Sequence, residues 1–423
     1  MQIKIDHIAK IEGHAGFVAD IADGNVTKAR LNIYEGARLL EGILQGRSFQ
    51  EVSQITSRIC GVCPVVHNLT SLKALEAALG VFPSQQTILL RKLMMMGQIL
   101  NSHALHLFFF SLSDFFGIKD DLKLIKKYSK KAKDALLLRN FGNKIIEIVG
   151  GRSIHPLTPA VGGFKKAPDQ EKIKEILKES SQALSAAVNL AKFFSRLKYP
   201  SFERQCNFVA LSLPDEYAVY DGLIKTEKEA ESISEFMPKI QEFQVKESPA
   251  AKRSQFKGES YMVGALARLN LNSKYLSPKA KSVFRETDLI LPISNPFYNI
   301  LAQAIEMVHC VQEAQELLEK AKDIDSGSVE PHPIEIKEGK GFGAIEAPRG
   351  TLFYFYEIDK NGLIKNANII TPTAQNLARL EDDLVEYLPK LTKSGKRLCK
   401  EECRDLIKML VRAYDPCLTC ATH

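Results

Sequence analysis

Tryptophan is absent from this chain, and so are the signals of several large classes of protein. There is no ferredoxin-like run of cysteines, no Gly-x-Gly-x-x-Gly and no P-loop, so the usual motifs for iron–sulfur clusters, dinucleotides and nucleoside triphosphates are missing. The longest apolar runs, such as Leu105–Leu112, are too short to span a bilayer. The N-terminal residues Met1–His7 lack the layout of a signal peptide or twin-arginine leader, which predicts a cytoplasmic protein.

The composition is that of a globular protein with a sizeable core. The 423 residues are 45% hydrophobic and 25% charged. The net charge of +7 comes from lysines interleaved with glutamates, and no dense basic stripe occurs. This distribution argues against nucleic-acid binding.

The periodicity predicts an α+β protein that is predominantly helical. Residues 3–34 alternate in short apolar runs and predict a β-hairpin or small sheet, and residues 351–358 read as a further strand. The polar segment 213–260 is expected to form a surface excursion rather than a separate domain. Long helices are expected at 85–110, 122–149, 170–197 and 296–321, with shorter ones at 39–44, 65–79, 374–388 and 401–411.

Two Cys-x-x-Cys pairs lie near opposite ends of the chain: Cys60 with Cys63, and Cys417 with Cys420. Four thiolates that a fold brings together make a tetrathiolate metal site. The ends of the chain would then converge, which favours one large intertwined domain over residues 1–423. Because zinc knuckles use much closer pairs, three readings stay open here: a redox metal, a structural zinc, and unrelated cysteines.

The residues around the first pair add a local prediction. Pro64 suits the first turn of a helix, because backbone N–H groups have no hydrogen-bond partner within the helix there and proline lacks one. This places Cys63 at the helix N-terminus. The helix dipole is expected to lower the pKa of the Cys63 thiol.

The flanking motifs decide between the readings. They are Arg58-x-Cys60-Gly61-x-Cys63-x-x-x-His67, Asp415-Pro416-Cys417-x-x-Cys420-x-x-His423, Ile11-Glu12-Gly13-His14, Ala347-Pro348-Arg349-Gly350 and Thr371-Pro372-Thr373. With these motifs the chain resembles the large, catalytic subunit of nickel-iron hydrogenases over essentially its full length. The short N-terminus and two further blocks, 34–38 and 102–106, look closest to the cytoplasmic, bidirectional group, which includes sulfhydrogenase-like and cofactor-coupled enzymes.

The resemblance implies the family's fold, a central bundle of long helices with small peripheral sheets, and its activity, the reversible heterolytic cleavage of dihydrogen. It also implies a nickel–iron centre whose iron carries carbon monoxide and two cyanides. Cys60 and Cys417 would be terminal ligands of nickel, and Cys63 and Cys420 would bridge the two metals.

The same resemblance assigns roles around the metals. Cys417 would be the first proton acceptor and Glu12 the next carrier, as a buried carboxyl with a raised pKa. Arg349 would lie over the open metal position, held there by Asp415.

Other residues would support the cofactor rather than react. Pro372 and Thr373 would surround a cyanide, with Thr373 hydrogen-bonded to it, and His67 would position a cysteine sulfur. Where many relatives have an aspartate before the His-x-x-His motif, this chain has Ser102, so one acid fewer surrounds Arg349.

A second metal, magnesium or iron, is expected at His423, because relatives place their terminal histidine on such an ion. Glu35 is the predicted carboxylate partner, with Glu41 as its rival. In the family a protease removes a short tail after the residue matching His423, so a chain that stops there is expected to be the mature form.

The resemblance also implies partners. An iron–sulfur small subunit must take the electrons, close to the face formed by residues 60–67, and further electron-transfer subunits, a maturation protease and nickel-insertion proteins are expected. Two alternatives compete with this reading. One is a hydrogenase-related subunit of a respiratory-type complex that has lost its metal site, and the other is a zinc-stabilised interaction protein.

Overall fold

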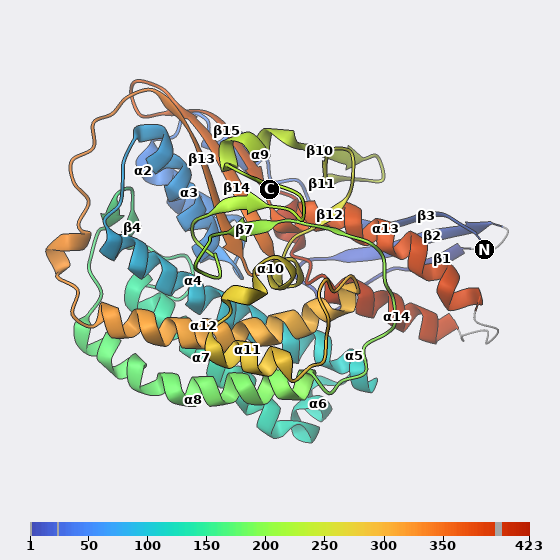
Figure 1. Ribbon diagram of the computed structural model, residues 1–423. Helices are drawn as coiled ribbons and strands as arrows, with labels where there is room; N and C mark the ends of the chain where they lie inside the picture. The colour runs from blue at the N-terminus through green and yellow to red at the C-terminus, as the bar shows by residue number, and fades with distance from the viewer. Residues whose placement is uncertain (1, 23–24, 394–399) are drawn as a thin grey trace.

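A computed structural model describes residues 2–22, 25–393 and 400–423. Four long helices run side by side through the lower half of the molecule in Figure 1, and small sheets lie above them. These helices are α4 (Gln85–Leu105), α7 (Ser129–Gly150), α8 (Gln170–Phe194) and α12 (Asn299–Ala321). The predicted fold class, mostly helical with a helix bundle and small sheets, is confirmed.

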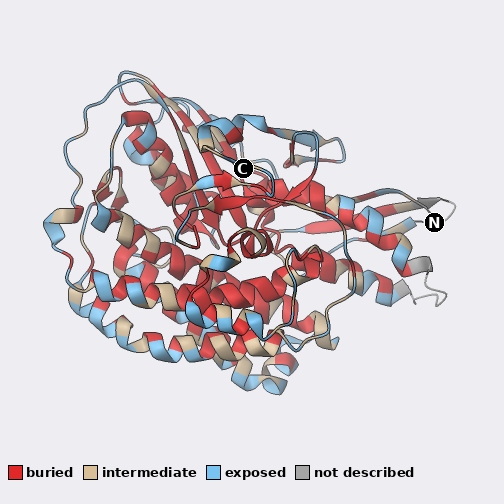
Figure 2. Ribbon diagram, viewed as in Figure 1, coloured by how far each residue is buried: buried red, intermediate tan, exposed pale blue. Residues whose placement is uncertain are grey.

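The helix bundle depends on close packing between α4 and α7. Gly97 and Gly142 face each other, and a Cβ atom built on Gly142 would lie 2.4 Å from the Gly97 carbonyl oxygen. The absence of side chains therefore lets the two backbones touch. Figure 2 shows the outcome: α8 is exposed along its outer side, whereas α4 and α12 are buried on most faces.

The predicted helix 85–110 is nearly correct, but its last part differs. After α4 the chain continues as one π-helical segment, His106–Ser111, and then as α5 (Leu112–Phe116). The wider turn changes the direction of the side chains that follow α4, and such turns recur at functional sites.

The remaining helices are shorter or lie at the ends of the chain. They are α1 (Leu40–Leu44), α2 (Phe49–Thr56), α3 (Pro64–Leu79), α6 (Asp121–Lys127), α9 (Ile233–Phe236), α10 (Ala265–Asn272), α11 (Pro278–Arg285), α13 (Pro372–Lys393), α14 (Lys400–Ala413) and α15 (Leu418–Ala421).

Two antiparallel three-stranded sheets matter most for the site. One is β1-β2-β3 (Gln2–Ile5, Ala15–Ala22, Asn25–Ile33), which confirms the sheet predicted for residues 3–34; positions 23 and 24 of the predicted turn lie outside the described residues. The other is β13-β14-β15, which packs against α3. Its strands are Gly339–Ala347, Gly350–Ile358 and Ile364–Ile370.

The other strands form small sheets of two or three strands. They are β4 (Pro159–Ala160), β5 (Gly163–Phe164), β6 (Asn207–Phe208), β7 (Ala210–Ser212), β8 (Leu223–Lys225), β9 (Ala230–Glu231), β10 (Ile240–Val245), β11 (Ser248–Phe256) and β12 (Tyr261–Met262). Segment 213–260 supplies β8 to β11 and α9. It is partly buried, because Ile224 and Phe236 join a second, smaller hydrophobic cluster with Phe353 of β14.

The two ends of the chain converge. The main hydrophobic cluster contains residues from Ile5 to Ala421. A parallel β-bridge joins Glu12 to Cys417, with Leu418 N donating to the Glu12 carbonyl over 3.0 Å. Among the described residues, no helix has both the length and the apolarity needed to cross a membrane.

Candidate metal centre

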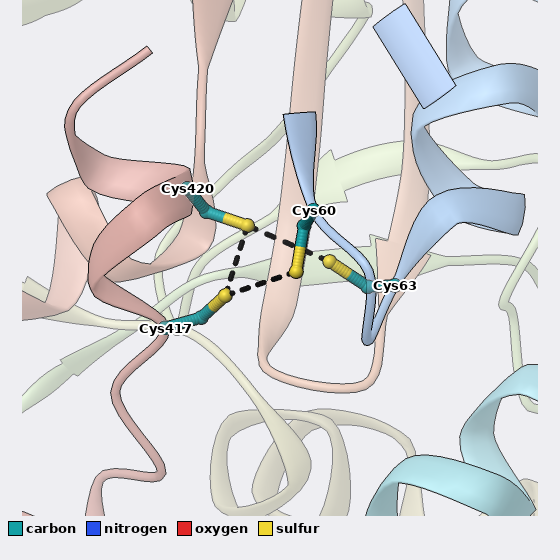
Figure 3. A group of neighbouring side chains, drawn as sticks. All are labelled: Cys60, Cys63, Cys417 and Cys420. Carbon is teal, nitrogen blue, oxygen red and sulfur yellow. Dashed lines mark hydrogen bonds between the residues drawn. The ribbon is translucent and has the colours of Figure 1, made fainter. Parts of the chain in front are cut away.

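Four cysteine sulfurs meet in the interior, as the sequence predicts. Their Sγ atoms all lie within 4.8 Å of one another, and all four residues are buried. Cys60–Cys417, Cys63–Cys420 and Cys417–Cys420 are separated by 3.3, 3.5 and 3.0 Å, and Figure 3 shows the four side chains converging from the two ends of the chain. These separations are far too long for disulfides.

Local structure explains how the cysteines are held. Cys63 is the N-cap of α3 with Pro64 in the first turn, which confirms that prediction, and Cys417 is the N-cap of α15. Each pair therefore lies at the start of a helix, where unpaired N–H groups favour thiolates. Cys60 also accepts a hydrogen bond from Val62 N at 3.3 Å.

The thiols compete for ionisation. Hydrogen bonds from Cys417 and Cys420 lower the pKa of Cys60 well below that of an ordinary thiol. Hydrogen bonds from the same two cysteines favour the Cys63 thiolate as well, but ionised Cys60 and burial outweigh them and raise the pKa of Cys63. The prediction that the helix dipole lowers the Cys63 pKa is therefore wrong for the bare thiols. All four buried cysteines can be thiolates at once only if cations lie between them. A coordinating metal displaces the thiol proton, and its positive charge offsets the repulsion between the thiolates.

A small cavity adjoins the sulfurs. Its lining is apolar apart from a few polar groups, and it contains the predicted Pro372, Thr373 and His67. The lining residues are Cys63, Val66, His67, Ala347, Pro348, Arg349, Leu352, Pro372, Thr373, Cys417 and Cys420.

The Arg349 guanidinium lies beside this cavity and is paired with Asp415. Its Nη2 donates to Asp415 Oδ1 over 2.9 Å, and its Nε donates to the Asp415 carbonyl over 2.8 Å. Nη1 donates to Ser102 Oγ over 3.3 Å, so the serine that replaces an aspartate still contacts the arginine. All three residues are buried.

Asp415 is itself held in place by two further residues. Gln303 Nε2 donates to Asp415 Oδ2 over 3.1 Å, and His106 Nε2 lies 3.9 Å from Oδ1. The backbone of Asp415 has φ 49°, in the left-handed region that aspartate tolerates better than most residues. This bend turns both its carbonyl and its carboxylate toward Arg349.

Glu12 lies on the other side of Cys417. The Cys417 thiol donates to Glu12 Oε2 over 3.1 Å. Thr419 fixes the carboxylate, because its N–H donates to Oε2 over 3.1 Å and its hydroxyl donates to Oε1 over 2.7 Å. The prediction that Glu12 is buried is wrong, because its side chain is only half-buried and lies between the cysteines and the outer part of the protein.

His67 and Thr373 contact cysteines rather than solvent. His67 Nε2 lies 3.5 Å from Cys420 Sγ, and its Nδ1 lies 2.8 Å from the hydroxyl of Tyr354. Burial lowers the pKa of His67 to about 3, so the ring is neutral. Thr373 Oγ1 accepts from Cys417 N over 3.0 Å, which leaves its hydroxyl hydrogen free to serve as a donor.

Glu35, the predicted partner of His423, is paired with another residue. Glu35 accepts hydrogen bonds from the backbone N–H of His14 and pairs with the His14 ring, at 2.9 and 2.8 Å. The rival, Glu41, lies 3.8 Å from His423 Nε2. His423 Nε2 also lies 2.7 Å from the Ile369 carbonyl oxygen, so a carboxylate, an imidazole and a carbonyl are gathered there.

Several residues that support the site are not predictable from the motifs. Thr419 lies within the second cysteine motif, and its position there is the one signal that could have drawn attention to it. Tyr354 and Gln303 come from distant elements, and nothing in the sequence links them to the site, whereas His106 is the second histidine of the His-x-x-His motif that follows Ser102.

The fold and the site define a class of protein. A buried set of four thiolates, with a carboxylate on one sulfur and an ion-paired guanidinium beside a small cavity, is the core of a metalloenzyme. Soft thiolate donors suit nickel and iron, and zinc sites with four cysteines rarely draw them from opposite ends of a chain.

Comparison with known proteins identifies the family. The family model described as nickel-dependent hydrogenase matches residues 38–136 and 216–423. The chain is 37% identical over 427 residues to the alpha subunit of sulfhydrogenase 1 from Pyrococcus furiosus, covering 100% of this chain and 98% of that protein. It is 32% identical over 429 residues to the alpha subunit of sulfhydrogenase 2 from the same organism, covering 100% and 99%.

A solved structure of an NAD+-reducing NiFe hydrogenase in the H2-reduced state superimposes with a TM-score of 0.89 at 28% identity, covering 100% of this chain and 99% of the other. The chain therefore belongs to the nickel-dependent hydrogenase family, as a large, catalytic subunit of a nickel–iron hydrogenase that cleaves dihydrogen reversibly. The match confirms the predicted family and leaves the zinc-stabilised module without support. The four assembled cysteines argue equally against a protein that has lost its metal site.

Proposed function

We propose that protons leave the metal centre through Cys417 and Glu12. When bound, the nickel–iron centre supplies the site at which dihydrogen is split into a hydride and a proton. The Cys417 sulfur takes up the proton and passes it to Glu12 Oε2, 3.1 Å away. This contact carries the proposal, because it lies within the distance for direct proton transfer.

The Arg349 guanidinium polarises the reacting molecule from the cavity side. Asp415 fixes its orientation through two hydrogen bonds, so the charge is aimed before the reaction begins. The planar fork of donors is essential to this arrangement, since lysine has the charge but no fixed geometry.

The cavity fits small ligands on iron. Three of the four cysteines line it: Cys63 and Cys420, which would bridge nickel and iron, and Cys417, which together with Cys60 would bind nickel alone. Apolar walls from Pro372 and Leu352 suit carbon monoxide, and the free hydroxyl hydrogen of Thr373 suits a cyanide nitrogen. His67 would orient the Cys420 sulfur.

Electrons would leave through an iron–sulfur small subunit. The loop before α3 reaches the surface at Arg58 and Gly61. Beside it lie the exposed apolar side chains of Ile154 and Leu157, since His155 Nδ1 contacts the Ser57 carbonyl at 2.9 Å. Exposed apolar side chains next to the loop that carries Cys60 suit contact with a partner subunit. Further electron-transfer subunits, maturation factors and a cytoplasmic location are part of the same proposal.

A second metal ion, magnesium or iron, would bind at the C-terminus. His423, the Ile369 carbonyl and Glu41 supply an imidazole and two oxygens. Glu41 takes the role first given to Glu35, because it is the one of the two that lies within 4 Å of the His423 ring, although it also pairs with Lys252 at 3.0 Å.

Replacement of Glu12 by glutamine tests the proton route. The amide keeps the shape of the side chain but cannot accept the proton, so hydrogen turnover and exchange of D2 with water should fall by about 100-fold or more. Nickel and iron contents should stay unchanged. Both rates and the metal contents are measured on the purified enzyme.

Glu51→Gln is the matched control, because Glu51 is an exposed glutamate on α2 that contacts no site residue. It should leave both rates unchanged. Normal exchange of D2 with water in the Glu12→Gln enzyme would remove Glu12 from the proton route.

A further inference from the structure

Arg349 occupies a two-residue turn between β13 and β14. Ala347 pairs with Gly350, so only Pro348 and Arg349 lie at the tip. A short turn transmits any change in its backbone directly to the side chain that it carries. What holds this turn therefore also sets the direction of the Arg349 guanidinium.

Arg268 on α10 holds the turn from behind. Its Nη1 donates to the Ala347 carbonyl over 2.9 Å, and its Nη2 donates to the Pro348 carbonyl over 3.0 Å. These are the two carbonyls that precede Arg349. Arg268 is 0% exposed, so bulk solvent does not reach these bonds.

Two carboxylates fix Arg268 in turn. Nε and Nη2 donate to the two oxygens of Glu306 over 2.6 and 2.7 Å, and Nη1 donates to Glu346 over 2.8 Å. With the two carbonyls, all five N–H donors of Arg268 have partners. No lysine could satisfy this arrangement, because its ammonium has three donors and no planar fork.

The same network reaches Arg349 from a second direction. Glu306 Oε2 lies 2.9 Å from His103 Nε2 on α4. The residue before His103 is Ser102, whose hydroxyl accepts from Arg349 Nη1. Glu306 thus links Arg268, which holds the turn, to α4, the helix whose Ser102 contacts the Arg349 guanidinium.

We propose that Arg268 is a positioning residue for the hydrogenase reaction: it fixes the 348–349 turn and thereby aims Arg349 at the metal centre. This inference rests on the proposed role of Arg349. Arg268 itself touches no cysteine, and it acts only through the turn.

A double-mutant cycle with Arg349→Lys tests the inference in the assembled enzyme. Arg268→Lys alone should lower hydrogen turnover by at least about tenfold, since a displaced catalytic group costs up to about 100-fold. In the Arg349→Lys background the same change should cost less than about twofold, because the residue through which it acts is already lost.

Amide hydrogen exchange gives a readout that does not depend on activity. The peptide that spans residues 347–350 should exchange faster in Arg268→Lys, whether or not metals are bound. Arg91→Lys is the matched control: Arg91 is equally buried and holds Glu76, Tyr220 and the Ala160 carbonyl, with no contact to the turn. It should leave turnover and exchange at 347–350 unchanged.

Equal losses from Arg268→Lys in both backgrounds, or unchanged exchange at 347–350, would overturn this inference alone. Wild-type turnover in Arg349→Lys would overturn the proposed role of Arg349 and this inference with it. If Arg268→Lys fails to fold, Glu346→Gln serves in the same cycle, because it weakens only one contact of Arg268. Its loss of turnover should likewise disappear in the Arg349→Lys background, and equal losses there would refute the inference.

Discussion

The contact between Glu12 and Cys417 joins residues that are 405 positions apart in the sequence. It forms because the backbone at Glu12 pairs with the backbone at Cys417 in a parallel β-bridge. This pairing places the two residues side by side. Thr419 then restricts the carboxylate with its N–H and its hydroxyl. A carboxylate held in one orientation beside the thiol is already placed for proton transfer, so little conformational entropy is lost when the proton moves.

Thr419→Val tests how much this restraint matters. Valine keeps the shape and the backbone N–H but lacks the hydroxyl that donates to Glu12. A hydrogen bond to a charged group contributes about 1.5–3 kcal/mol, so hydrogen turnover should fall by roughly tenfold or more with the metals retained. Thr419→Ser keeps the hydroxyl and should remain within about twofold of the wild type. Equal turnover in the valine and serine enzymes would show that the hydroxyl has no part in proton transfer.

The sequence motifs predicted the metal-binding cysteines better than they predicted the residues that surround and orient the site. The four cysteines could be found from spacing and flanking residues, and the structure brings them together. The carboxylate beside His423 could not, because Glu35 and Glu41 lie six positions apart and the path of α1 is what brings Glu41 within 3.8 Å of the ring. The Cys63 pKa depends on three other sulfurs, which a helix-dipole argument leaves out.

At the scale of elements, two tight backbone features position the chemistry. The β13–β14 turn carries Arg349, and the α4–α7 contact carries the helix that presents Ser102. Strands and long helices were predictable from periodicity. The π-helical segment His106–Ser111 was not, because a single wider turn leaves the apolar pattern almost unchanged.

Gly142→Ala tests the contact between α4 and α7. The added methyl group would meet the Gly97 carbonyl, so the helices must separate. Overpacking of this kind costs about 1–3 kcal/mol, which urea or thermal unfolding should detect as lower stability.

Gly42→Ala is the control for this substitution, because Gly42 lies in α1 with nothing within 4 Å of an added Cβ. Alanine favours helix by up to about 1 kcal/mol over glycine, so stability should stay the same or rise. A Gly142→Ala protein as stable as the Gly42→Ala protein would contradict this account, because it would show that α4 and α7 can accommodate the added methyl group without loss of stability.

At the scale of the whole molecule, the fold serves to bring the two ends of one chain into a single core. The four sulfurs meet within one main hydrophobic cluster that includes residues from Ile5 to Ala421. The family resemblance predicted this architecture, whereas the paired cysteines alone predicted only that the ends converge. Segment 213–260 shows where composition misleads, since a polar stretch still supplies buried residues such as Phe236.

The most direct test of the nickel–iron assignment is infrared spectroscopy of the purified protein together with its metal content. We predict nickel and iron in equal amounts, with stretching bands of metal-bound carbon monoxide and cyanide. Cys63→Ser and Cys420→Ser should lose these bands, because each sulfur is proposed to bridge both metals. Zinc alone in the wild-type protein, with no carbonyl or cyanide bands, would contradict the assignment of the four cysteines to a nickel–iron centre.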